Sequence, residues 1–262
     1  MSAIITSIYN CPVKSISFQN IEKCKINKNI GIEGDRVFAF SQNLDLDQSK
    51  EFEKNPEARK GKWNKIVTLK NTPVFNKYNF SNEDNKLTLT LKDKEIISIN
   101  INNFDERDDL AKKLIELESS LKNDIRLMRN DEYPFYDTSI SNKSIFNNSI
   151  SLININSVRD FENKIDRKIE ISTFRGNLYF DGMEAWEERN WIGKTLKINN
   201  VLFKVEKNIP RCVAINLKPK TDDNSFNLLK ILKQTYDHYD MGVYLTPEND
   251  GEINLSEKIL IK

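Results

Sequence analysis

Short runs of hydrophobic residues recur along the chain, and their period predicts mainly β structure. Residues 3–9 are apolar and β-branched, which is typical of a buried strand. Residues 87–91 alternate between Leu and Thr and are followed, after four charged residues, by the apolar run 96–101. This alternation predicts a hairpin. Further strands are expected at residues 21–26, 37–40, 63–69, 74–80, 124–129, 150–155, 195–198, 201–205, 241–245 and 258–261.

Helical periodicity is confined to a few segments. Four leucines in residues 104–121 recur at spacings of four, three and four, so they lie on one face of a helix. Ser157 is placed to cap a second helix that runs to residue 165. Shorter helices are expected at residues 51–59 and 225–234. Many strands with a few short helices predict an α+β fold that is mainly β.

The chain is long enough for one large or two medium domains. It has 262 residues, of which 38% are hydrophobic and 30% charged, as in a globular protein with a real core. The long helix should end near Asn123, and this end is a candidate boundary between the halves 1–122 and 123–262. Residues 133–148 show no period and predict a long loop.

Charge and composition exclude several classes of function. The 40 basic and 39 acidic residues give a net charge of +1, which argues against a general nucleic-acid binder. Any basic patch must be local, and it would fit a small anionic ligand better than a polymer. No segment approaches the ~18 apolar residues of a membrane span, and no basic stretch precedes the first apolar run as in a signal peptide.

Cysteine and histidine usage narrows the possible sites further. The three cysteines are Cys11, Cys24 and Cys212, an odd number without CxxC spacing. This usage suits a reducing compartment, so a cytoplasmic location is expected. The lone His238 excludes a histidine-rich metal site, and its polar neighbours favour a position on the surface.

Cys212 is the first candidate for chemistry, because it follows Arg211 just after the predicted strand 201–205. A neighbouring guanidinium favours the thiolate, which is the form that attacks or ligates a metal. The alternative is that Cys212 is a small hydrophobic residue of the core.

Three other short stretches combine cations with polar groups. Lys14 and Ser15 follow the end of the first strand, where they could bind a phosphate or form an ordinary exposed turn. Arg36 follows two glycines three residues apart, and it is either an ion-pair partner or an anion clamp. Arg175 and Asn177 should alternate on one face of a strand, as a hydrogen-bonding pair for a phosphate or heterocycle.

Four motifs, taken together and in order, resemble those of one family. They are residues 9–15 (Tyr-Asn-Cys-Pro-Val-Lys-Ser), 31–36 (Gly-Ile-Glu-Gly-Asp-Arg), 174–177 (Phe-Arg-Gly-Asn) and 210–212 (Pro-Arg-Cys). The chain resembles the MOSC-domain proteins, among them the mitochondrial amidoxime-reducing component and its bacterial relatives. The resemblance implies an N-terminal MOSC-type β-barrel region at 1–122 and a MOSC domain at 123–262.

The same resemblance implies a molybdenum cofactor, a metal–pterin (molybdopterin) group with a terminal phosphate. Cys212 would be the metal ligand, since a soft thiolate suits molybdenum. Asp137 would be a candidate proton source. The residues implied in cofactor binding are Lys14, Ser15, Arg36, Thr138, Ser139, Arg175, Asn177 and Arg211.

Three hypotheses of function follow and stay open at the level of sequence. The first is an oxidoreductase that reduces small N-hydroxylated or N-oxygenated compounds. The cysteines of a ferredoxin domain are lacking, so electrons would come from a separate ferredoxin-like or cytochrome b5-like protein with its reductase. The second is a non-catalytic carrier of molybdenum cofactor or of sulfur, through a persulfide on Cys212. The third is a β-rich interaction protein without a cofactor, in which Cys212 belongs to the core.

Overall fold

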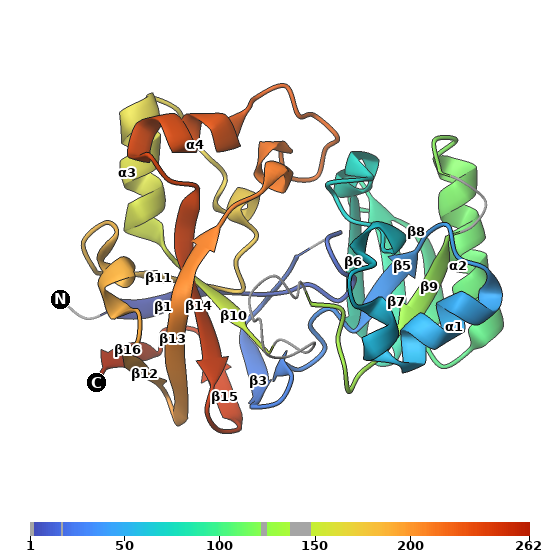
Figure 1. Ribbon diagram of the computed structural model, residues 1–262, viewed down its shortest axis with the longest axis horizontal. Helices are drawn as coiled ribbons and strands as arrows, with labels where there is room; N and C mark the ends of the chain where they lie inside the picture. The colour runs from blue at the N-terminus through green and yellow to red at the C-terminus, as the bar shows by residue number, and fades with distance from the viewer. Residues whose placement is uncertain (1–2, 17, 122–124, 137–147) are drawn as a thin grey trace.

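Two lobes lie side by side in the computed structural model, which describes residues 3–16, 18–121, 125–136 and 148–262. A β-barrel with two helices above it occupies the left of Figure 1, and a second β-rich lobe with α1 and α2 occupies the right. The second lobe, which we call the N-terminal lobe, comprises β5 to β9. The predicted α+β fold, mainly β with a few short helices, is confirmed.

Seven strands of the described chain close the barrel. Their order is β1, β11, β10, β14, β13, β12 and β16, and β16 pairs back to β1. All neighbours are antiparallel except β10 and β11, which are parallel. The strands are β1 (Ala3–Asn10), β10 (Ile150–Asn154), β11 (Leu178–Asp181), β12 (Thr195–Ile198), β13 (Val201–Pro210), β14 (Asp240–Pro247) and β16 (Lys258–Ile261). Closure leaves no free edge among these seven strands, which removes a common route to aggregation.

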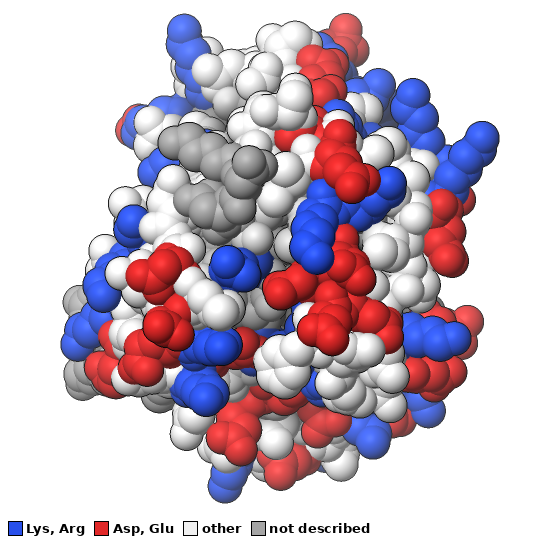
Figure 2. Space-filling model, turned by 90° about the vertical axis from the view of Figure 1, so that its right-hand side faces the viewer, with Lys and Arg blue, Asp and Glu red and all other residues white. Residues whose placement is uncertain are grey.

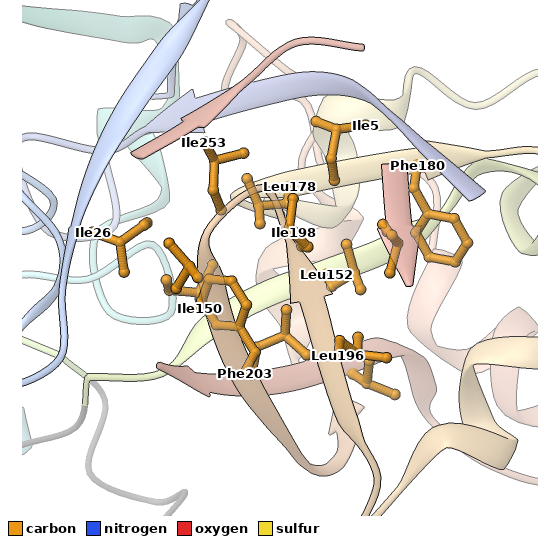
Figure 3. Close-up of a cluster of buried hydrophobic side chains, with 14 of the residues drawn as sticks. Ile5, Ile26, Ile150, Leu152, Leu178, Phe180, Leu196, Ile198, Phe203 and Ile253 are labelled. Atoms are coloured by element: carbon orange, nitrogen blue, oxygen red, sulfur yellow. The ribbon is translucent and has the colours of Figure 1, made fainter. Parts of the chain in front are cut away.

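Alternate side chains of the barrel strands point inward and fill its centre (Figure 3). On β12 and β13 the inward residues include Leu196, Ile198 and Phe203, each with no exposed surface. Phe180 on β11 stacks on Trp191, with ring centroids 5.1 Å apart. The alternation visible in the sequence thus becomes the two faces of a barrel wall. The predicted β12–β13 hairpin is confirmed, and its turn residue Asn199 has a φ of 52°.

Short strands extend the barrel toward the N-terminal lobe. The predicted single strand at 21–26 is divided at Glu22 into β2 (Gln19–Ile21), which pairs with β1, and β3 (Lys23–Asn27). β3 pairs with β4 (Gly31–Ile32) and with β15 (Gly251–Asn254), a strand that the sequence did not predict because it holds only one large apolar residue. The first strands of the chain therefore lie in the barrel lobe, although they precede the predicted boundary near residue 123.

The N-terminal lobe contains two small sheets and a core of its own. The hairpin predicted at 87–101 is confirmed, and its turn residues Lys92 and Asp93 both have positive φ, as a type I′ turn requires. The elements are β5 (Phe38–Ser41), α1 (Leu46–Lys54), η1 (Pro56–Arg59), η2 (Trp63–Lys65), η3 (Pro73–Lys77), β6 (Tyr78–Glu83), β7 (Lys86–Leu91), β8 (Lys94–Asn100), α2 (Phe104–Leu117) and β9 (Arg126–Arg129).

Two strand predictions in this lobe are wrong. The segment 63–69 begins with a 3₁₀ turn and contacts β5 through a single bridge between Ser41 and Ile66, so it forms no ladder. The segment 74–80 begins as a second 3₁₀ turn, because Pro73 occupies its first position and favours a helical start. Only from Tyr78 onward does the chain form a strand.

Helices α3 (Ile155–Ile165) and α4 (Leu228–Tyr236) pack at one end of the barrel (Figure 1). The N-cap of α3 is Asn154, whose side chain accepts from the Asn156 amide, and the prediction of Ser157 as the cap is wrong. Ser157 is buried instead, and its hydroxyl donates to the Glu188 carboxylate at 2.8 Å. Three short 3₁₀ turns complete this lobe: η5 (Ile171–Phe174), η6 (Glu187–Trp191) and η7 (Val213–Asn216).

Acidic and basic side chains are intermixed on the outer face of the N-terminal lobe (Figure 2). This face therefore shows none of the one-sign expanses by which nucleic-acid binders are recognised. Within the described residues, no helix combines the length and the apolar composition needed to cross a bilayer.

Candidate functional site

Cys212 lies at the point where the chain leaves the barrel wall. It lies two residues after Pro210, the last residue of β13, and directly before η7, with its carbonyl accepting from the Ile215 amide at 3.2 Å. Cys212 is an exposed free thiol, whereas Cys11 and Cys24 are buried. The hypothesis in which Cys212 belongs to the core is therefore wrong, because the thiol is open to reagents and ligands.

Arg211 is held rigidly beside this thiol. Its Nη1 donates to the carbonyl of Phe174 at 2.6 Å, and its Nε donates to the carbonyl of Met241 at 2.9 Å. Burial lowers the pKa of Arg211, and nearby Tyr244 opposes this shift. Arg211 thus connects η5 and β14 to the segment between β13 and η7 that carries Cys212, and these bonds fix the position of its guanidinium.

Arg175 brings a second guanidinium to the same place. It has a φ of 51° at the end of η5, and its guanidinium lies 4.7 Å from the ring centre of Phe18. Burial lowers the pKa of Arg175; nearby Cys11 opposes this shift, Arg36 adds to it, and Cys212 opposes it to a smaller extent. Among the described residues we find no carboxylate or hydrogen-bond acceptor for this guanidinium. A half-buried cation without an anion is costly, so this position is suited to an anionic ligand.

The predicted geometry of Arg175 and Asn177 is wrong in one respect. The two residues do not share a strand face, because β11 begins only at Leu178 and Arg175 adopts a left-handed turn conformation. Asn177 is 1% exposed, and its Oδ1 accepts from the Ser151 hydroxyl at 2.8 Å. Its Nδ2 donates to the carbonyl of Tyr9 at 3.3 Å. The Asn177 side chain therefore joins barrel segments, and it positions the turn that carries Arg175.

Arg36 forms an ion pair with the neighbouring Asp35, a carboxylate that is 1% exposed. Burial opposes the charge of Arg36, but the Asp35 carboxylate keeps the pKa of Arg36 above its ordinary value. The other oxygen of Asp35 accepts from the Cys11 amide at 2.7 Å, and the Arg36 amide donates to the Cys11 carbonyl at 2.6 Å. Sequence analysis missed this role of Asp35, although its position between Gly34 and Arg36 was the available signal.

Lys14 and Ser15 lie on the segment that runs beside Arg36. The Phe38 amide donates to the Pro12 carbonyl at 3.0 Å, and the Lys14 amide donates to the Phe38 carbonyl at 2.8 Å. Lys14 is 5% exposed, and Ser15 has a φ of 66°. These backbone contacts bring the first two motifs of the sequence together.

Some predicted site residues cannot be placed. Asp137, Thr138 and Ser139 lie outside the described residues.

His238 is partly buried rather than free on the surface, and it stacks on Tyr236 with ring centroids 5.7 Å apart. No contact connects His238 to Cys212 among the described residues.

A pocket of about 380 Å³ adjoins Arg175 between the two lobes. Tyr9, Phe18, Glu170 and Arg175 line it from the barrel lobe, and Tyr78 lines it from β6. The sequence indicated neither the pocket nor a role for Phe18, because the pocket forms only where the two lobes meet.

The residues present fit an anionic cofactor that carries its own metal. The described residues contain no cluster of three or more His, Cys, Asp or Glu side chains suited to hold a bare metal ion. They contain instead one exposed thiol beside Arg211 and Arg175, with Arg36 close to Arg175. Such a donor set suits a negatively charged group that needs one additional soft ligand.

The candidate site combines a closed barrel with an exposed cysteine near Arg211 and Arg175. Comparison with known proteins shows which family this part of the chain resembles. Residues 137–259 match the family described as the MOSC domain. Residues 137–259 of this chain thus match a MOSC domain, and parts of the chain are distantly similar to the mitochondrial amidoxime reducing component.

The curated relatives match only in part. Mitochondrial amidoxime reducing component 2 of Bos taurus is 26% identical over 111 residues, which are 42% of this chain and 32% of the bovine protein. The protein of the same name from Rattus norvegicus is 35% identical over 72 residues, 28% of this chain and 21% of the rat protein. The matched region thus spans a third or less of these relatives.

Two bacterial proteins of known structure align with this chain at low structural similarity. YiiM from Geobacillus stearothermophilus has a TM-score of 0.35 and 18% identity, over 43% of this chain and 53% of that one. The YuaD protein from Bacillus subtilis has a TM-score of 0.44 and 11% identity, over 100% of this chain and 96% of that one.

Thiol reactivity provides a direct test of the site. We expect an aromatic disulfide reagent to modify one thiol per chain rapidly in the native protein, because only Cys212 is exposed among the three cysteines. The other two should react only after unfolding. The Cys212→Ser variant should show no rapid phase, and two or more rapid thiols in the native protein would contradict the burial of Cys11 and Cys24.

Proposed function

We propose that this chain binds a molybdenum cofactor and reduces N-hydroxylated or N-oxygenated compounds with electrons from a separate protein. The observation that carries the proposal is the exposed Cys212 thiol beside Arg211 and Arg175. The MOSC-domain match and the distant similarity to the amidoxime reducing components support it. When bound, the cofactor would supply two-electron chemistry at molybdenum.

The residues of this chain would each have a separate task. Cys212 would ligate the metal through its thiolate. Arg175, Arg36, Lys14 and Ser15 would bind the anionic parts of the cofactor, and Arg175 is the residue best prepared for this role, since it lacks an anion. The charge of such a ligand would offset the mutual repulsion of Arg175 and Arg36.

Asn177 and Arg211 would act by positioning the other residues of the site. Asn177 holds the turn before β11 through its contacts with Ser151 and Tyr9. Arg211 holds η5 and β14 against the segment that carries Cys212. We further propose Thr138 and Ser139 as cofactor contacts and Asp137 as a proton source.

The proposed reaction consumes two electrons and two protons for each N–O bond that is cleaved, and it releases the oxygen as water. Protons must therefore reach the substrate, while the electrons come from a ferredoxin-like or cytochrome b5-like donor with its reductase. Cys212 lies in an exposed segment, so a small substrate can approach it without prior opening of the barrel.

A second candidate function is that of a carrier for molybdenum cofactor or sulfur. The exposure of Cys212 favours it as well, because an accessible thiolate can hold a persulfide. In this case the chain would bind and hand over its cargo without turnover. Release of thiocyanate from Cys212 upon treatment with cyanide would identify the persulfide.

Elemental analysis combined with an activity assay tests the proposal. Protein expressed in a host that makes the cofactor should contain about one molybdenum per chain. It should also convert benzamidoxime to benzamidine when a reduced viologen donates the electrons. Absence of molybdenum from the folded protein would contradict the reductase and the cofactor carrier. Molybdenum without turnover would favour the cofactor carrier over the reductase.

A further inference from the structure

The pocket between the lobes has a wall of aromatic rings. Tyr9 and Phe18 are both half-buried, and their ring centroids lie 6.3 Å apart in an edge-to-face arrangement. They form one side of the 380 Å³ space, with Arg175 at its margin. Ring faces of this kind bind flat aromatic groups through apolar contact and stacking.

Direct contacts between the lobes keep the pocket walls in place. Asn76 donates through Nδ2 to the carbonyls of Lys218 and Thr221, at 2.8 and 2.6 Å. These bonds hold the segment after η7 against η3 of the N-terminal lobe. Tyr78 is fixed on the same side, because its hydroxyl donates to the Glu118 carboxylate at 2.5 Å. The pocket is therefore largely preformed.

Glu170 is the acidic residue that lines this pocket. Its carboxylate is exposed and accepts from the Ser172 hydroxyl at 2.5 Å, and among the described residues it has no cationic partner. Its charge reaches the aromatic wall, since burial and the Glu170 carboxylate both raise the pKa of Tyr9.

The positive charges of Arg175 and Lys220, which also line the pocket, are balanced by groups other than Glu170. Lys220 pairs with Asp93 of the N-terminal lobe at 3.5 Å. The charge of Arg175 would be taken up by the anionic cofactor under the proposed function. The Glu170 carboxylate then remains as the uncompensated charge, and it favours positive ligands over neutral or negative ones.

We propose that the pocket between the lobes binds flat aromatic cations next to the Cys212 site, and that Glu170 determines its preference for positive charge. The inference rests on the proposed function, because it requires that the cofactor occupies Arg175. It assigns substrate selection to residues of both lobes, with the charge preference set by one carboxylate.

Binding of two inert probes tests the preference without any turnover. Benzamidine is a cation, and benzamide is a neutral molecule of nearly the same shape. In calorimetric titrations of the molybdenum-loaded protein, we expect benzamidine to bind roughly 1.5- to fivefold more tightly, the range for one exposed charge pair. The Glu170→Gln variant should lose this difference and keep the affinity for benzamide. Equal affinities for the two probes in the unmodified protein would overturn the inference.

A matched control separates Glu170 from a general effect of surface charge. Glu184→Gln removes another exposed carboxylate, which does not line the pocket, and it should leave the preference unchanged. Glu170→Lys should reverse the preference, so that benzoate binds more tightly than benzamidine. If Glu184→Gln removes as much of the preference as Glu170→Gln, the charge effect is not local and the inference fails.

Turnover of substituted amidoximes distinguishes this inference from the proposed function. Benzamidoximes with a para-aminomethyl, para-methyl or para-carboxylate group should be reduced with kcat/KM decreasing in this order. Glu170→Gln should lower kcat/KM for the aminomethyl compound alone. Reduction of all three without any effect of Glu170 would overturn the inference and support the reductase. Glu170-dependent binding of benzamidine without any reduction would support the pocket and contradict the reductase.

Discussion

The Cys212→Ala variant should lose molybdenum-dependent reduction of amidoximes by about 100-fold or more, because the metal would lose its only protein ligand. Bound molybdenum should decrease as well. The fold should persist, since an exposed side chain outside the core contributes within about 0.5 kcal/mol to the free energy of unfolding. Metal analysis, turnover with a reduced viologen and thermal unfolding on the same preparation measure the three quantities.

Cys24→Ala is the matched control for loss of a thiol. Cys24 on β3 is 5% exposed, and burial and nearby carboxylates such as Asp35 raise its pKa to about 12. It therefore carries no thiolate at neutral pH, and its removal should reduce stability slightly without loss of metal. If Cys212→Ala kept full molybdenum content and activity, the assignment of the metal ligand would be wrong.

The Gly242→Ala variant should lose about 2–5 kcal/mol of the free energy of unfolding, the largest effect on stability that we expect from a single methyl group. Gly242 has a φ of 82°, and a Cβ atom would lie 2.4 Å from the carbonyl oxygen of Leu152 in the adjacent strand. Backbone cannot move away as a side chain can, so β14 must separate from β10. Urea unfolding of the variant measures the loss.

Gly193→Ala separates the steric effect from backbone strain. Gly193 has nearly the same φ, 83°, but a Cβ there would meet nothing within 4 Å. It should lose about 1 kcal/mol, through the left-handed conformation alone. Because Met241 precedes Gly242 and accepts from Arg211, the Gly242→Ala variant should also lose molybdenum. Equal losses of stability in the two variants would contradict the close approach of β14 and β10.

Local patterns predicted most of the strands correctly, because alternation reports which face of a strand is buried. The hairpins β7–β8 and β12–β13 could be read directly from alternation and from their turns. The incorrect predictions fell on segments whose local sequence is compatible with two different structures. Pro73 started a 3₁₀ turn within an apolar run, and Asn154 capped α3 in place of Ser157, which was drawn to the buried Glu188.

The sequence by itself determined the β-rich fold, the candidate cysteine beside Arg211 and the motifs that carry Arg36 and Arg175, because these depend on residue type and on spacing along the chain. Only the tertiary structure decided that Cys212 is exposed, that Asn177 is buried with its amide used internally, and that a pocket forms beside Arg175. Exposure and pairing depend on which distant segments close over a residue. Closure of β1 onto β11 and the contact between the lobes bring those segments together from positions far apart in the chain.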